Sequence, residues 1–286
     1  MMQDGRALQA ATSHYLGTTF AEAQEIQFQD RNGEKRYCHT TSWGASTRLL
    51  GGVVMVHGDD DGLRLPPMVA PKQIVIVPLL RGKGDDGALL EYCDEIARRL
   101  GAETYGSAPV RVHVDKRDER SVEKRWNWLR KGAPIICEIG PGEREHRQVS
   151  YVRRDRARDG DKLAWSKVSV DAFVGEAPAT LASIQSTLFD AASANMKSRI
   201  VSDLKTMDDI RAYFGADDAD DATRAPGWAS CTWTKPEGAV LEALTDELKK
   251  MGLTIRNAPS AQQERLGQCV FTGRDAIERV LIGRAY

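Results

Sequence analysis

The fold of this chain depends most on one stretch, Thr40-Thr41-Ser42-Trp43-Gly44-Ala45-Ser46-Thr47-Arg48-Leu49-Leu50-Gly51-Gly52, which runs into the apolar residues 53–56. Small residues surround Trp43 and Arg48, and the glycines let a ligand approach the backbone closely. An arginine at the edge of an apolar element can hold a phosphate through two hydrogen bonds or stack on a purine. It can equally pair with a nearby aspartate. The stretch alone leaves both readings open.

The composition of the chain argues against a membrane-spanning protein and against a disulfide scaffold. The chain has 286 residues, 41% of them hydrophobic, and no apolar run near the ~18–20 residues that a membrane helix needs. At about 100–200 residues per domain, this length predicts two or three domains. The cysteines are odd in number and scattered, and no hydrophobic leader precedes them, so we expect a reducing cytosol and no disulfide scaffold. They are Cys38, Cys93, Cys137, Cys231 and Cys269.

Charge is distributed unevenly although the net charge is only −1. Residues 107–162 hold fifteen Lys and Arg against ten Asp and Glu, so this segment carries +5. Residues 203–222 hold seven Asp against two basic residues, so this one carries −5. Such asymmetry is typical of a protein with one polyanion-binding part, although two solvated surfaces would give the same counts.

The first part of the chain predicts a hairpin and then a stiff connector. Residues 26–30 and 36–41 are predicted to be strands. The Asn32-Gly33 pair between them is a strong signal for a hairpin turn. The prolines between Leu65 and Pro71 restrict the backbone, so we expect a domain boundary there.

The middle of the chain alternates strand and helix, which predicts an α/β domain with a mostly parallel or mixed sheet. We expect strands at 73–80, 110–114, 134–139 and 148–152, and helices at 85–100 and 121–131. After a long helix over 171–198, the acidic segment 217–221 reads as a linker. A helix at 241–251 and strands at 253–256, 268–271 and 280–282 then predict a compact α+β tail.

No metal site is predicted. Cys231 and Cys269 each lack a second cysteine at ligand spacing, and the five histidines have no paired spacing. The cluster His57-Gly58-Asp59-Asp60-Asp61-Gly62 fits an exposed turn better than a magnesium site. Neither a P-loop nor a Gly-x-Ser-x-Gly elbow is present.

Several blocks in order resemble prolyl-tRNA synthetases of the archaeal/eukaryotic type, which are class II aminoacyl-tRNA synthetases. The blocks begin with Gly5-Arg6-Ala7-Leu8-Gln9-Ala10-Ala11-Thr12-Ser13-His14-Tyr15-Leu16-Gly17, continue with residues 41–48 and 57–67, and close with Lys131-Gly132-Ala133-Pro134, Glu138-Ile139-Gly140-Pro141 and Arg284-Ala285-Tyr286. Six ordered blocks spread over the whole chain are far more specific than any one of them.

The resemblance implies a fold in three parts. Residues 1–70 would be the motif 3 end of an antiparallel class II catalytic sheet, residues 71–170 an α/β anticodon-binding domain with a mixed sheet, and residues 171–286 an α+β C-terminal domain. The family's zinc-binding branch has a cysteine where this chain has Thr272, so we expect the third part to lack structural zinc.

The resemblance also implies the site. Arg48 would be the catalytic motif 3 arginine, and Gln9, Thr12, Ser46 and Arg48 would bind ATP, which arrives with Mg²⁺. His14 and Trp43 would contact proline. Fixed cationic groups suit this chemistry, because charge builds on the phosphates when a carboxylate attacks ATP.

The anticodon contacts of related enzymes do not carry over, since Leu129 and Ile136 stand where the family has an acid and an arginine. Trp126 and Trp128 could stack on bases, although packing is also a common role for tryptophan. We predict tRNA contacts at Trp128, Arg130, Lys131 and Glu143.

These features predict a proline–tRNA ligase that is cytoplasmic, homodimeric when intact, not membrane-bound, and specific for tRNA-Pro and L-proline. Motifs 1 and 2 are absent from this sequence, so we expect a fragment with little activity of its own. The alternative is a non-catalytic tRNA-binding accessory paralogue, and a nucleotide-binding regulatory protein is a more distant one.

Overall fold

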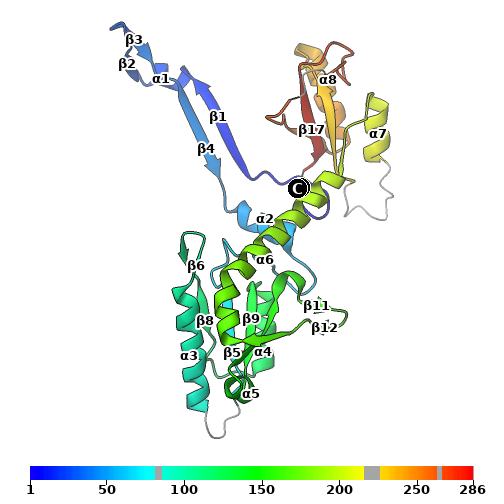
Figure 1. Cartoon of the computed structure of the whole chain (residues 1–286). Helices are drawn as coiled ribbons and strands as arrows, with labels where there is room; N and C mark the ends of the chain where they lie inside the picture. The colour runs from blue at the N-terminus through cyan, green and yellow to red at the C-terminus, as the bar shows by residue number, and fades with distance from the viewer. Residues whose placement is uncertain (81–85, 216–225, 263–265, 286) are drawn as a thin grey trace. The chain divides into compact units, whose positions relative to one another are not determined.

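The computed structural model describes residues 1–80, 86–215, 226–262 and 266–285, and it divides into two compact units. The first unit combines Met1–Met55 with Arg199–Tyr286, and the second is Val56–Ser198 (Figure 1). These limits differ from the expected boundaries after residues 70 and 170. The expected acidic linker at 217–221 and the final Tyr286 lie outside the described residues.

The second unit is built on a five-stranded mixed sheet in the order β13-β10-β9-β5-β8. β5 (Ile74–Pro78) pairs in parallel with β8 (Val112–Val114) and β9 (Ile135–Ile139), and β10 (Gln148–Arg153) pairs antiparallel with both β9 and β13 (Ser166–Ser169). All five residues of β5 are buried, as expected of a strand covered on both faces. The mixed sheet predicted from the sequence is confirmed.

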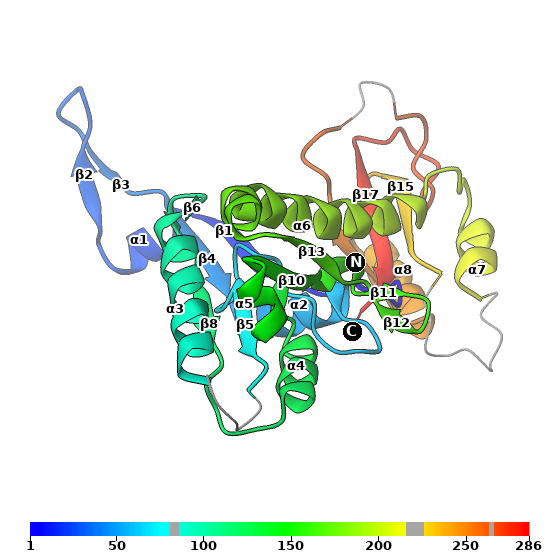
Figure 2. The same ribbon diagram turned by 60° about the horizontal axis from the view of Figure 1, so that its bottom comes forward.

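Helices cover both faces of this sheet (Figure 2). On one face, α3 (Asp86–Ala102) and α6 (Val170–Ser198) pack against Ile74 and Ile76. On the other face, Leu129 of α4 (Ser121–Arg130) packs against Val75 and Val77. Because α6 contributes its buried stripe to this core, it belongs with the sheet and not with the C-terminal part. The shorter elements are β6 (Thr104–Tyr105), β7 (Ala108–Pro109), α5 (Pro141–Glu145), β11 (Arg158–Asp159) and β12 (Lys162–Leu163).

The N-terminal part of the first unit is a long two-stranded ribbon. It pairs β1 (Ala11–Gly17) with β4 (Thr40–Ala45), and β4 leads into α2 (Arg48–His57), which crosses the unit boundary at its last two residues. Between β1 and β4 lie α1 (Thr19–Ala23) and the hairpin of β2 (Gln27–Gln29) and β3 (Lys35–Tyr37). The predicted hairpin is confirmed, whereas β1 was not expected.

The C-terminal part of the first unit is a four-stranded sheet in the order β14-β15-β17-β16. Its strands are β14 (Ile200–Val201), β15 (Trp228–Trp233), β16 (Leu253–Asn257) and β17 (Glu278–Arg284). The core also takes apolar side chains from α7 (Met207–Gly215) and α8 (Gly238–Lys250). The expected strand at 268–271 is wrong, because that segment makes one isolated bridge, Gln268 to Asp275, and turns back on itself.

Among the described residues, no helix combines the length and the apolar character needed to cross a bilayer.

Candidate functional site

The ribbon of the first unit forms a pocket where β1 begins and β4 ends. Antiparallel pairing sets Thr12 opposite Gly44 and Ala11 opposite Ala45. The pocket has a volume of about 290 Å³. It is lined by Gln9, Ala10, Ala11, Thr12, Gly44, Ala45, Ser46 and Arg48, so the structure brings together all four residues predicted to bind ATP.

Local geometry keeps this pocket open toward the start of α2. A Cβ atom on Gly44 would lie 3.4 Å from Thr12 Oγ1, so a larger residue there would crowd the Thr12 hydroxyl. At the other side, Ser46 Oγ accepts the backbone N–H of Arg48 at 3.3 Å. The first N–H groups of a helix and its dipole both favour an anion, and α2 begins at this pocket. Arg48 itself is exposed.

The two residues predicted to contact proline do not share one face of the ribbon. His14 pairs with Ser42 and has the same strand parity as Thr12, whereas Trp43 pairs with Ser13. Side chains alternate between faces along a strand, so Trp43 lies on the face opposite Thr12 and His14. Trp43 is 77% exposed there.

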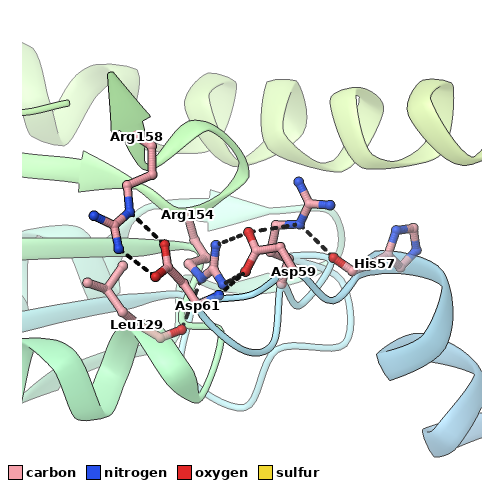
Figure 3. Close-up of polar contacts among 7 residues, drawn as sticks. His57, Asp59, Asp61, Leu129, Arg154 and Arg158 are labelled. Carbon is pink, nitrogen blue, oxygen red and sulfur yellow. Dashed lines mark hydrogen bonds and ion pairs between the residues drawn. The ribbon is translucent and has the colours of Figure 1, made fainter. Parts of the chain in front are cut away.

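A second polar cluster lies at loop 57–62 of the second unit (Figure 3). Arg154 is only 2% exposed and makes a two-bond ion pair with Asp59, Nη1 to Oδ2 at 2.7 Å and Nη2 to Oδ1 at 2.5 Å. Arg158 pairs with Asp61 in the same way, Nε to Oδ2 at 2.7 Å and Nη2 to Oδ1 at 2.5 Å. Arg154 Nε also donates to the Leu129 carbonyl at 3.0 Å. These bonds fix the loop against the sheet domain.

The pKa values of the two aspartates follow from this pairing. Burial raises the pKa of Asp59, but the Arg154 hydrogen bonds and charge outweigh it, and the net pKa is lowered. The Arg158 hydrogen bonds lower the pKa of Asp61. Residues 59–62 form a turn in which Asp59 and Asp60 are exposed, as expected, and the ion pairs of Asp59 and Asp61 also attach this turn to the sheet domain. Within the described ranges, no group of three or more His, Cys, Asp or Glu side chains could hold a metal ion.

Two of the predicted RNA contacts lie together near the end of α4. Lys131 Nζ is 5.0 Å from the Trp128 ring centroid, a cation–π distance. Both residues line a pocket of about 240 Å³ together with Leu65, Pro71, Lys72 and Ala133. Arg130, one residue before Lys131, is exposed.

Glu143 is placed differently, because it follows β9 whereas Lys131 precedes that strand. Its carboxylate accepts the Gly140 N–H at 3.1 Å, the Ser150 hydroxyl at 3.0 Å and Lys167 Nζ at 2.8 Å. Burial raises the pKa of Glu143, and these bonds more than offset it, so the net pKa is lowered. Glu143 thus fastens the start of α5 to β10 and β13.

The two positions where the sequence departs from the family's anticodon contacts are both in the core. Leu129 and Ile136 have 0% exposed surface and pack with Val75 and Val77. Sequence reasoning missed three neighbours of Trp128, namely Lys72, His113 and Asp115. The sequence shows the alternation of Val112, His113 and Val114. No local pattern in it indicates that this strand contacts a helix beginning at Ser121.

Cys231 and Cys269 are both buried in the core of the C-terminal sheet. Burial raises the pKa of Cys231 to about 12. For Cys269, burial also raises the pKa, but hydrogen bonds from Thr272 and neighbouring backbone groups outweigh it, so its net pKa is lowered. All five cysteines are free thiols.

A family model matches the sheet domain of the second unit. Residues 73–179 match the family model described as "Anticodon binding domain". That range starts just before β5 and ends within α6, so it covers the five-stranded sheet, α3 and α4.

Similarity to particular proteins extends over the whole chain. The chain is 47% identical over 287 aligned residues to proline–tRNA ligase of Novosphingobium aromaticivorans, covering 100% of this chain and 55% of that protein. It is 48% identical to proline–tRNA ligase of Sphingopyxis alaskensis, covering 53% of it, and 37% identical to that of Protochlamydia amoebophila, covering 55%. The chain thus spans about half the length of these curated relatives, all three of which are bacterial.

Proposed function

We propose that this chain supplies the ATP-binding motif 3 and the tRNA-binding parts of a proline–tRNA ligase. The observation that carries this proposal is the pocket lined by Gln9, Thr12, Ser46 and Arg48, in a chain similar throughout its length to proline–tRNA ligases. The parent activity would join proline to ATP as prolyl-adenylate and then transfer proline to tRNA-Pro.

The pocket suits electrostatic stabilisation of phosphates. When the proline carboxylate attacks the α-phosphate and pyrophosphate leaves, charge develops on the phosphate oxygens. The Arg48 guanidinium and the Thr12 and Ser46 hydroxyls are groups that can bind such oxygens directly. Among the described residues, the pocket lining includes no carboxylate. Mg²⁺ would arrive on the ATP phosphates. His14, on the same ribbon face as Thr12, is the proposed proline contact, and Trp43 would belong to a surface on the opposite face.

For the RNA, we propose contacts at Trp128, Arg130 and Lys131. Trp128 offers an aromatic surface and the two basic residues offer phosphate contacts, which is the combination found at single-stranded RNA sites. Glu143 would act indirectly, by holding α5 and β13 in place.

The enzyme type, the catalytic-sheet fragment and the zinc-free C-terminal sheet are also proposals. The quoted sequence blocks support the archaeal/eukaryotic type, the antiparallel β1–β4 ribbon supports a motif 3 fragment of a class II sheet, and the buried Cys231 and Cys269 support a C-terminal sheet without zinc. A cytoplasmic homodimer is the expected state of the intact ligase.

Photolabelling with 8-azido-ATP tests the ATP site. The wild-type chain should be labelled, excess ATP should protect it, and the labelled peptides should come from the segments around Gln9 or Ser46. Arg48→Met should lose most of the labelling, whereas Arg36→Met, on the distal hairpin, should leave it unchanged. An accessory paralogue released from catalysis predicts no ATP-protected labelling in the wild-type chain, and that result would contradict the proposal.

A further inference from the structure

The 240 Å³ pocket beside Trp128 includes Lys72, a residue that the proposed function above does not use. Its walls come from the connector (Leu65, Pro71, Lys72), from α4 (Trp128) and from the turn before β9 (Lys131, Ala133). Binding sites for whole small molecules usually occupy about 300–1,000 Å³. This pocket therefore has room for one planar group rather than for a large ligand.

The Trp128 indole is held firmly at the wall of this pocket. Its Nε1 donates to Asp115 Oδ2 at 2.7 Å. Asp115 has 0% exposed surface, and Arg117 donates to its two carboxylate oxygens at 2.9 and 2.6 Å. Burial raises the pKa of Asp115, but the Arg117 and Trp128 hydrogen bonds lower it much further, so the carboxylate stays ionised. A fixed indole loses little entropy when a ring packs against it.

A second aromatic ring lies next to the indole at a tilt. His113 of β8 lies with its ring centroid 5.2 Å from that of Trp128, at an interplanar angle of 56°. Burial and the charge of Lys72 lower the pKa of His113, which favours its neutral form. Lys72 and Lys131 are therefore the cationic groups of the pocket, and no acid lines it within the part of the chain that the structure describes.

We propose that this pocket takes one unstacked nucleotide of single-stranded RNA. The base would pack against Trp128, Pro71 and Leu65, in the place over the indole that the Lys131 ammonium occupies in this structure. Lys131 would move off the ring, and Lys72 and Lys131 would bind the phosphates on either side. Both lysines are exposed, so they can reach a backbone that passes over the pocket mouth. The inference deepens the proposed tRNA binding and rests on it. It adds Lys72, and it assigns Trp128 a base rather than a packing role.

The test measures binding of a fluorescein-labelled tRNA-Pro transcript to the 286-residue chain over a range of salt concentrations. Stacking of one base contributes about 1–3 kcal/mol, so Trp128→Ala should weaken binding by about 5- to 150-fold. Lys72→Gln and Lys131→Gln should each lower the slope of log affinity against log salt by about 0.7 or less. Matched controls are Trp165→Ala, a partly exposed tryptophan outside the pocket, and Lys162→Gln, an exposed lysine of the same unit on β12.

Crosslinking at a defined RNA position distinguishes the loss of a base contact from the unfolding of a variant. Transcripts carrying 5-iodouridine in the loops should crosslink to the peptide that contains Trp128, and Lys72→Gln with Lys131→Gln should reduce that crosslink while leaving the thermal midpoint unchanged. Trp128→Phe serves if Trp128→Ala does not fold, because it keeps a ring but loses the bond to Asp115.

The outcomes separate this inference from the proposed function. If the wild-type chain prefers tRNA-Pro but all three pocket variants bind like the controls, the pocket proposal is overturned and the ligase assignment stands. If AMP alone binds with an affinity that Trp128→Ala abolishes while RNA binding is unaffected, the occupant is a free nucleotide and the proposal is also overturned. If the wild-type chain shows no preference for tRNA-Pro but the crosslink at Trp128 persists, the ligase assignment fails and RNA binding in the pocket survives.

Discussion

The Asp59–Arg154 pair is the side-chain contact on which loop 57–62 depends. Removing one partner of a buried ion pair leaves an uncompensated charge, which typically costs about 3–5 kcal/mol. Asp59 is about one-third exposed, so we expect Asp59→Asn to lower the free energy of unfolding by about 2–3 kcal/mol, because it leaves Arg154 buried without its carboxylate. Urea unfolding at pH 7 measures this cost.

Asp60 provides the matched control for that change. It lies in the same loop and is exposed, and no hydrogen bond or ion pair of its side chain is found among the described residues. Asp60→Asn should therefore change stability by less than about 0.5 kcal/mol. Equal costs for the two substitutions would show that the ion pair does not stabilise the loop.

The pKa values of Asp59 and Asp61 predict that these two side chains stabilise the fold less in acid. Both pKa values are lower in the folded protein than in the unfolded chain. Their contribution is therefore fully present above the unfolded pKa of about 3.9, and it is lost as pH falls through the lower folded values. The stability difference between wild type and the double variant Asp59→Asn/Asp61→Asn should shrink as pH falls below about 4. A difference that is constant from pH 7 to pH 2.5 would contradict this.

At the level of single residues, the predicted ATP-binding residues lie together, but the positions of other residues could not be predicted from the sequence. Gln9, Thr12, Ser46 and Arg48 do line one pocket, as the resemblance implied. The separation of Trp43 from His14 could not be predicted, because it requires knowing that residues 11–17 form a strand and in which register it pairs. The ion pairs of loop 57–62 could not be predicted for a similar reason, since Arg154 is 95 residues away from Asp59.

Among the elements, the end of α4 depends on Gly132. Its φ is +76°, and an added Cβ would lie 2.7 Å from Leu63 Cβ and 2.8 Å from two Leu63 backbone atoms. Gly132→Ala must therefore both strain the backbone and displace the connector, so we expect a cost above about 2 kcal/mol. Gly160→Ala is the control, because Gly160 has φ +59° but open space at its Cβ position. Thermal unfolding should show Gly132→Ala as the more destabilising change, and equal midpoints would contradict the steric argument.

Elements with strong hydrophobic periodicity were predicted well. The stripe Leu89, Cys93, Ile96 and Leu100 is buried on α3, and residues 74–78 form a buried strand. In contrast, β1 and β15 were missed, because ATSHYLG and WASCTW mix small and aromatic residues without alternation. The apolar run at 268–271 misled because Cys269 is buried within a turn rather than in a ladder.

On the scale of the whole molecule, the two units have separate cores, and this predicts separable unfolding. Leu181 is buried in the core of the second unit and Ile282 in that of the first. Calorimetry should show two transitions. Leu181→Ala and Ile282→Ala should each cost about 2–5 kcal/mol, and each should lower the midpoint of a different transition. A single transition that shifts with both variants would show that the units unfold together.

The division into units was not visible in the sequence. The proline-rich connector suggested a boundary near residue 70, yet Leu63 and Leu65 hydrogen-bond to Arg130 and Gly132, so the connector belongs to the sheet domain. Residues 1–55 and 199–286 form one unit through long-range contacts such as the Ala7 N–H donating to the Arg284 carbonyl. Local patterns carry no signal of such pairing.

We propose that this chain is part of a ligase specific for tRNA-Pro, and its discrimination between tRNAs tests that proposal. Binding of the purified 286-residue chain to tRNA-Pro should be compared, at matched salt, with binding to a transcript that differs only in its anticodon. We expect tighter binding to tRNA-Pro, by at least about ten-fold, and a preference that persists as salt rises. Equal affinities for the two transcripts at every salt concentration would contradict it.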